Sequence, residues 1–213
     1  MISFPFLCNL IYETVSVNIM YKIPLRYQAT EYDCGSAAII NAINYAFDFS
    51  EIPAYFLKEI YDVCLDEYNE NGLFGGHGTS LNALRYLADW FNRYRETHGF
   101  PIHCLCVDGE DVTFIRNTKL LDILREKETA IVLRCMLYNE HYITLTDADD
   151  EYIYLFDPYY WIKDYGDSQI LRVSEPMRAN RKLPISFMET TEQNCYNINT
   201  VKEKLAVVFS RKP

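Results

Sequence analysis

The sequence is short of glycine, proline and basic residues, and each shortage excludes a class of protein. Glycine and proline number eight each among 213 residues and 49% of the residues are hydrophobic, which excludes a disordered or low-complexity chain. Lys and Arg total 20 against 30 Asp and Glu, which gives a net charge of −10 and no basic run to neutralise phosphates. We therefore expect neither nucleic acid nor an anionic membrane surface as a partner.

Long hydrophobic runs and paired cysteines are also missing. Residues 1–17 have no basic start, and Asn9 and Glu13 interrupt them before the ~20 residues that a membrane-spanning helix needs. We expect no signal peptide or membrane span there, but an N-terminal strand. The seven cysteines are odd in number and follow no repeating spacing, which argues against a disulfide framework and favours a reducing compartment, the cytoplasm.

The chain consists of a helical first half and a β-rich second half without a linker, which predicts a single domain over residues 1–213. Apolar residues at helical spacing predict helices over residues 34–47, 50–66 and 81–97 and a short one from 117 or 118. Short β-branched and aromatic runs predict strands over residues 102–107, 130–133, 142–146, 152–156 and 204–209. The order predicts an α+β fold, with an N-terminal helical half packed on a C-terminal antiparallel sheet.

Cys34 stands at the start of the first expected helix, with Asp33 at the N-cap position. Backbone N–H groups and the positive end of the helix dipole favour a thiolate at such a position. Gly35 would let a substrate backbone approach closely, and Gln28, six residues before Cys34, can donate an N–H to an oxyanion. Cys34 is therefore a candidate nucleophile, although most cysteines act as small apolar packing residues.

His141 and Asp157 flank a predicted β-hairpin whose turn centres on Asp149. Each lies eight residues from that centre, so a regular register would place them opposite each other, with Cβ atoms about 5 Å apart. An aspartate in this position holds an imidazole in one tautomer and stabilises its protonated form. The pair is a candidate base and orienting acid; the alternative is a structural hydrogen bond at a strand end.

These residues carry a family resemblance. The run QATEYDCGSAA from Gln28, the run HYITL from His141 and the Asp157-Pro158 pair resemble the papain-like C39 peptidases, which process double-glycine leader peptides, and their stand-alone relatives. The resemblance covers residues 24–160. It implies a papain-like fold in which Cys34 is the nucleophile, His141 the general base, Asp157 its orienting partner and Gln28 an oxyanion-hole donor. The sequence has no membrane-spanning run and no phosphate-binding Gly-x4-Gly-Lys loop, so leader-peptide cleavage is not implied specifically.

One glycine-dense segment precedes the third helix and supplies the remaining substrate-binding candidates beside Gly35, namely Gly76, His77, Gly78 and Thr79. Without a following lysine, this segment is interpreted as a flexible loop on the substrate side of the cleft.

His103, Cys104 and Cys106 alternate along a predicted strand, which places the histidine on the opposite face from the two cysteines. We therefore predict no metal site.

The residues together predict a cytoplasmic cysteine peptidase or thiol hydrolase that acts on a peptide or protein and needs no cofactor. Two alternatives remain. A transglutaminase-like acyl transferase uses the same chain order of Cys, His and Asp, but the 107 residues between Cys34 and His141 are many for its compact core. A non-catalytic peptide-binding module on the same fold is the other. The sequence does not indicate the oligomeric state.

Overall fold

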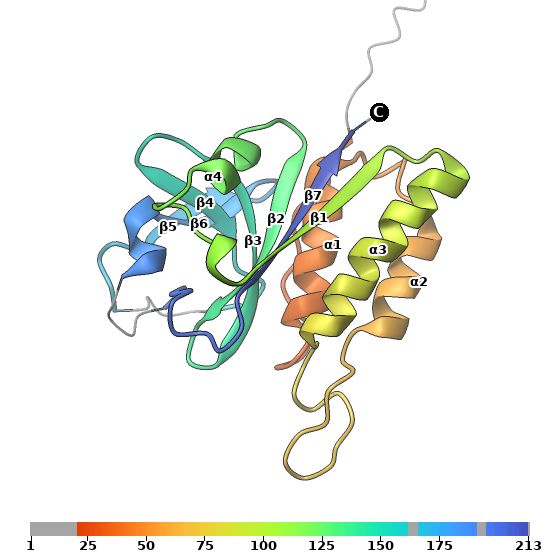
Figure 1. Ribbon diagram of the computed structural model, residues 1–213, viewed down its shortest axis with the longest axis horizontal. Helices are drawn as coiled ribbons and strands as arrows, with labels where there is room; N and C mark the ends of the chain where they lie inside the picture. The colour runs from red at the N-terminus through yellow and green to blue at the C-terminus, as the bar shows by residue number, and fades with distance from the viewer. Residues whose placement is uncertain (1–20, 162–165, 191–194, 213) are drawn as a thin grey trace, which may run out of the picture.

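The computed structural model of the chain describes residues 21–161, 166–190 and 195–212. Three helices cover one face of a seven-stranded sheet in which every neighbouring pair is antiparallel (Figure 1). This arrangement confirms the predicted α+β class and the packing of an N-terminal helical half on an antiparallel sheet. The predicted N-terminal strand lies outside the described residues.

The helices form close to where apolar spacing predicts them. Within the described residues they are α1 (Cys34–Ala46), α2 (Ala54–Val63), α3 (Leu81–His98) and α4 (Lys119–Leu124). The start of α3 is capped by Ser80, whose Oγ accepts a hydrogen bond of 3.1 Å from the Ala83 N–H. At the other end Gly99 adopts a left-handed φ of 69°, a conformation in which glycine ends helices readily. No helix of the described part is long and apolar enough to cross a membrane.

The sheet combines five predicted strands with two that the sequence pattern missed. The strands are β1 (Ile102–Asp108), β2 (Thr129–Met136), β3 (Glu140–Ala148), β4 (Tyr152–Phe156), β5 (Leu171–Glu175), β6 (Ala179–Pro184) and β7 (Leu205–Arg211). Their order is β1-β7-β2-β3-β4-β6-β5, so the last strand of the chain lies between β1 and β2. The unpredicted strands are β5 and β6, which extend the sheet beyond β4 at one edge.

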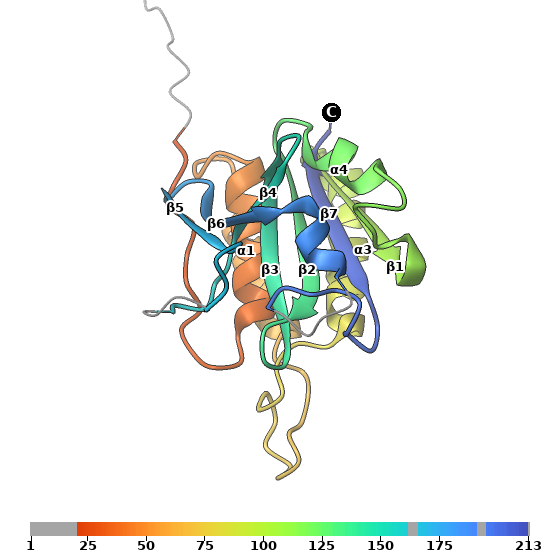
Figure 2. The same cartoon turned by 90° about the vertical axis from the view of Figure 1, so that its left-hand side faces the viewer.

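The sheet separates two hydrophobic cores. One core lies between the sheet and α1, α2 and α3. The other lies on the opposite face, under α4, the 3-10 helix η2 (Ile185–Glu189) and the segment that leads from it to β7. Figure 2 looks onto this second face, where the blue C-terminal segment lies across the strands. The face of the sheet that the first three helices leave open is therefore covered by α4 and by the chain that follows β4.

Candidate active site

Cys34 is the first residue of α1, as the sequence predicts, and it is half-buried. Asp33 occupies the N-cap position, but its side chain makes no capping hydrogen bond to the helix. The carboxylate instead accepts hydrogen bonds from the preceding loop, at 3.0 Å from Ala29 N, 2.6 Å from Thr30 N and 2.7 Å from Thr30 Oγ1. Asp33 thus fixes the loop before the cysteine and does not neutralise the positive end of the helix dipole by capping it.

The predicted contact between His141 and Asp157 is present. His141 Nε2 lies 2.8 Å from Asp157 Oδ1, and the two side chains are almost fully enclosed, with residue exposures of 6% and 0%. Burial alone would lower the pKa of His141, but the charges of Asp157 and Cys34, together with side-chain hydrogen bonds to both, raise the pKa to about 10. Cys34 therefore lies close enough to the His141 ring to raise its pKa, and because Nε2 faces Asp157, Nδ1 is the ring nitrogen available to the sulfur.

The register behind this contact differs from the predicted one. In the structure β3 and β4 pair Thr144 with Phe156, and a bulge follows between Leu145 and Asp147. Continued by one residue, this register places Asp157 opposite Ile143, so the prediction that it stands directly opposite His141 is wrong. The difference is two residues, an even number, and Asp157 therefore keeps to the same face as His141 and reaches it diagonally.

Asp157 is held by residues that the sequence reasoning missed. Asn180 on β6 clamps its backbone, since Asp157 N donates to Asn180 Oδ1 and Asn180 Nδ2 donates to Asp157 O, both at 2.8 Å. Tyr159 N donates to Asp157 Oδ1 at 2.9 Å, and Tyr196 Oη donates to Oδ2 at 2.6 Å. Asn180 and Tyr196 come from the part of the chain without a readable pattern, and no local signal in the sequence singles them out.

Gln28 is tied by its backbone to the segment that follows Asp157. Its N–H donates to the carbonyl oxygen of Pro158, the residue after Asp157, at 2.8 Å. Its Nε2 donates to Thr30 O at 2.7 Å, while Oε1 is buried and has no hydrogen-bond partner among the described residues. A primary amide carries two N–H donors, so the bond to Thr30 leaves Nε2 a second hydrogen. Gln28 is not among the residues that line the cleft beside Cys34.

A cleft of about 690 Å³ opens beside Cys34. Its wall includes three of the predicted substrate-binding residues, His77, Gly78 and Thr79, together with side chains from β2 and β3. The other lining residues are Glu31, Tyr32, Glu67, Arg134, Met136, Tyr138, Asn139, Glu140, Tyr142, Thr200 and Lys202. Residues from the first turn of α1, the loop before α3, the β2–β3 hairpin and the segment before β7 therefore meet around one thiol.

The remaining two substrate-binding candidates, Gly35 and Gly76, do not line this cleft. A Cβ at Gly35 would lie 2.7 Å from Thr79 Cβ, so the glycine lets α1 and the Thr79 segment pack directly together. A Cβ at Gly76 would lie 2.7 Å from Asn69 Nδ2, within the loop that joins α2 to α3. Each glycine is explained by packing behind the cleft wall.

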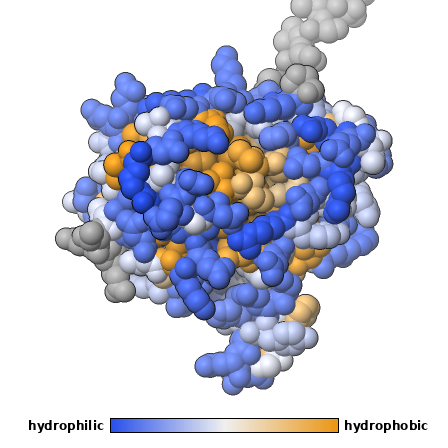
Figure 3. Space-filling model, in the orientation of Figure 1, coloured by the Kyte–Doolittle hydropathy of each residue, from blue (hydrophilic) through white to orange (hydrophobic). Residues whose placement is uncertain are grey.

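The loop between α2 and α3 projects from the molecule (Figure 1). Tyr68 and Phe74 pair across it as an isolated bridge, and both side chains, like that of Leu73, are exposed. Hydrophobic atoms therefore appear among the hydrophilic ones on this loop (Figure 3). Its base carries Gly78 and Thr79, which makes the loop one rim of the cleft.

The other five cysteines of the described residues are free thiols with raised pKa values. Burial raises the pKa of Cys64 to about 12 and of Cys106 to about 11, and burial also raises the values of Cys104, Cys135 and Cys195. These thiols stay protonated at neutral pH. Within the described residues no group of three or more His, Cys, Asp or Glu side chains is placed to hold a metal ion.

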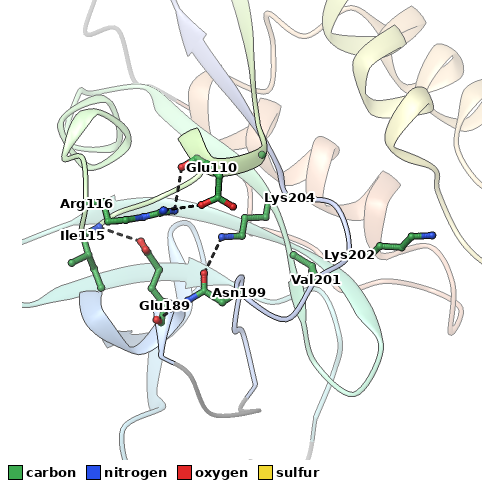
Figure 4. Close-up of a pocket in the computed structure, with 9 residues that line it drawn as sticks. Glu110, Ile115, Arg116, Glu189, Asn199, Val201, Lys202 and Lys204 are labelled. Atoms are coloured by element: carbon green, nitrogen blue, oxygen red, sulfur yellow. Dashed lines mark hydrogen bonds and ion pairs between the residues drawn. The ribbon is translucent and has the colours of Figure 1, made fainter.

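A second cavity, of about 580 Å³, lies on the other face of the sheet and is shown in Figure 4. Its polar side chains bind protein groups: Arg116 pairs with Glu110 at 2.7 Å, Glu189 accepts from Ile115 N at 3.1 Å, and Lys204 donates to Asn199 at 2.9 Å. Neither cysteine nor histidine lines it. Of these two cavities, only the cleft of Cys34 is lined by a cysteine and a histidine.

The solved structures that are similar to the chain include two proteases from transporters. One is the peptidase domain of Streptococcus ComA, a bifunctional ABC transporter involved in a quorum-sensing pathway, with 14% identity and a TM-score of 0.43 over 89% of this chain and 98% of that one. The other is a double-glycine-motif protease from an AMS/PCAT transporter in complex with the leader peptide, with 12% identity and a TM-score of 0.42 over 91% and 94%. No family model and no curated protein matches.

Proposed function

We propose that the chain is a thiol hydrolase of the cysteine peptidase type, which cleaves a peptide or isopeptide bond through Cys34, His141 and Asp157. One observation carries this proposal. A buried His141–Asp157 pair lies beside a cysteine that begins a helix and lines the 690 Å³ cleft, close enough for this cysteine to raise the pKa of His141. The nucleophile, the base and the orienting carboxylate thus lie next to one another in space, as thiol catalysis requires.

The first half of the reaction forms a thioester. The Cys34 thiolate attacks the substrate carbonyl carbon, and the carbonyl oxygen takes the negative charge of the tetrahedral intermediate. The second N–H of Gln28 Nε2 and the backbone N–H of Cys34 are proposed to donate hydrogen bonds to this oxygen. The intermediate then collapses, the carbon–nitrogen bond breaks, and the His141 imidazolium gives its proton to the departing amine.

The second half of the reaction releases the acid. Neutral His141 takes a proton from water, the resulting hydroxide attacks the thioester carbon, and the carbon–sulfur bond breaks to restore the Cys34 thiolate and the His141 imidazolium. The raised pKa of His141, about 10, supports this cycle because the ring returns to its protonated form at neutral pH. Asp157 keeps the ring oriented through both halves.

The cysteine chosen as nucleophile is distinguished by its surroundings. Burial raises the pKa of the other five described thiols, whereas Cys34 begins α1 and lies beside the His141 ring. A helix start and a nearby imidazolium both favour the thiolate. This contrast supports Cys34 and makes the proposal testable without a known substrate.

The test compares Cys34→Ala with Cys106→Ala, which removes another half-buried thiol. At neutral pH we expect iodoacetamide to alkylate Cys34 first in the unaltered chain, and a mixture of proteome-derived peptides to gain new termini with the unaltered chain and with Cys106→Ala. Cys34→Ala should give none. If Cys34 reacts no faster than Cys106, the nucleophile is wrongly assigned. If an added primary amine, such as glycine methyl ester, is incorporated in preference to water, the chain is an acyl transferase.

A further inference from the structure

Tyr196 is a fully buried tyrosine whose hydroxyl reaches the candidate site from the far end of the chain. Its exposed fraction is 0%, and its Oη donates to Asp157 Oδ2 at 2.6 Å. The residue belongs to the segment between η2 and β7, 39 positions after Asp157. The reaction proposed above assigns this hydroxyl no role.

The two oxygens of Asp157 are divided between different partners. Oδ1 faces His141 Nε2 at 2.8 Å and accepts from Tyr159 N at 2.9 Å, while Oδ2 accepts from Tyr196 Oη. Since Asn180 also binds both backbone groups of Asp157, the backbone and both carboxylate oxygens are held. Rotation of the carboxylate about its Cβ–Cγ bond would break the Tyr196 and His141 contacts together.

The backbone at Tyr196 is strained, and the surrounding chain maintains that strain. Its φ of 66° lies in the left-handed region, which disfavours a residue with a bulky side chain. Hydrogen bonds from Tyr196 N to Met136 O and from Met136 N to Asn197 O tie this turn to the end of β2. Strain of this kind persists where the surrounding structure over-determines it, and it clusters at functional sites.

We infer that Tyr196 is a positioning residue that fixes the carboxylate of Asp157 for His141. This inference rests on the proposed function and assigns a role in it to the C-terminal segment. A hydroxyl that donates to a carboxylate favours the ionised form of the acid. Tyr196 therefore keeps Asp157 both oriented and charged, and its loss should show at acid pH, where the carboxylate takes up a proton.

The test compares Tyr196→Phe with Tyr154→Phe. The control removes the same kind of bond, because Tyr154 Oη donates to Asp149 Oδ2 at 2.9 Å at the exposed hairpin turn. The first measurement follows the ring signals of His141 by nuclear magnetic resonance as pH falls. The second follows the rate at which iodoacetamide alkylates Cys34 over the same range. Neither measurement requires a substrate.

In Tyr196→Phe we expect the acid-side midpoint of both profiles to move up by about one to two pH units, the size of a hydrogen bond to a charged group. Tyr154→Phe should leave both midpoints unchanged. Once a substrate is known, kcat in Tyr196→Phe should fall about tenfold while KM stays the same. Unchanged profiles in Tyr196→Phe would overturn the inference, since a purely structural tyrosine would alter stability but not the protonation of Asp157.

A further measurement, on the unaltered chain, tests the inference if Tyr196→Phe does not fold. In the unaltered chain, the low-field hydroxyl proton of Tyr196 should shift as Asp157 titrates and should shift again in Asp157→Asn. If the chemical shift of this proton responds to neither change, the hydroxyl is not bound to the carboxylate and the inference fails. Failure of the proposed function looks different: peptide cleavage would then be absent in the unaltered chain or would survive Cys34→Ala, whatever the Tyr196 measurements give.

Discussion

The two halves of the proposed site are built in different ways. Cys34 is half-buried, and its loop is fixed by bonds that span three or four residues, from Asp33 back to Ala29 and Thr30. Asp157 is fully buried, and it is bound by side chains 16, 23 and 39 positions away. A nucleophile must meet its substrate, whereas the groups that orient the base gain from rigidity and exclusion of water. The proposed reaction therefore requires that substrate can reach Cys34 and that water is excluded from Asp157.

The largest effect is expected on the enclosed side, from Asp157→Asn. The amide cannot stabilise the His141 imidazolium, so the pKa of His141 should fall towards its usual range and kcat should fall by about 10⁴, the loss that this change causes in a serine protease triad. A titration of the His141 ring signals, with cleavage assays in parallel, measures both. Asp149→Asn, at the hairpin turn, is the control. An unchanged His141 pKa would show that Asp157 does not govern the ring.

The free energy of unfolding should also depend on pH, because Asp157 raises the pKa of His141 in the folded state. Since the folded pKa of His141 is about 10 and the unfolded value 6.5, the ring contributes stability in full below pH 6.5, and this contribution is lost as pH rises through 10. The free energy of unfolding of the unaltered chain should therefore fall over this window. Denaturant titrations at several pH values measure the decline, which should be smaller in Asp157→Asn. An equal decline in both proteins would assign it to other groups.

In the half of the site that holds the nucleophile, the largest loss of activity is expected from Gly35→Ala. Alanine is normally the better helix former, but here its Cβ would lie 2.7 Å from that of Thr79, so the start of α1 must move. A displacement of about 1 Å at a nucleophile costs on the order of 10²-fold in rate. Cleavage assays and thermal unfolding should both show the loss. Ser36→Ala, which removes only the bond from Ser36 Oγ to Asp33 O, should retain most activity.

The contrast between a nucleophile held by nearby residues and a carboxylate held by distant ones also explains which features could be predicted from the sequence. The start of α1 at Cys34 and the span of β4 both depend on local signals, namely apolar spacing and β-branched runs. The cysteine and its helix were accordingly predictable, and Gln28, His141 and Asp157 were identified through the motif.

The supports of Asp157 were not predictable in this way. Four of the five residues of β5 are exposed at the sheet edge, so they show no alternation of apolar and polar positions. The bulge after Leu145 shifts the hairpin register without a sequence signal such as glycine. Asn180 and Tyr196 reach Asp157 through the strand order and the chain path after η2, which depend on the whole fold.

The smallest effect is expected away from both halves, at the pair that joins Glu51 to the end of β7. Arg211 binds Glu51 through two hydrogen bonds of 2.7 Å, and the guanidinium lowers the pKa of Glu51 to about 2. About a third of each side chain is exposed, so water and salt screen the pair, and Glu51→Gln should lower the free energy of unfolding by about 0.5–1 kcal/mol. Because the folded pKa lies below the usual value of 4.5, this contribution is present above pH 4.5 and lost as pH falls through 2.

Denaturant titrations at pH 7 and at pH 2 measure this difference, with Glu96→Gln on the exposed face of α3 as the matched control. We expect a small loss at pH 7, a smaller one at pH 2 and unchanged alkylation of Cys34 at both. A change in Cys34 reactivity would mean that the packing between α2 and the sheet influences the position of the start of α1. The proposed site would then depend on the whole helical layer, and the contrast between a locally built nucleophile and a globally held base would fail.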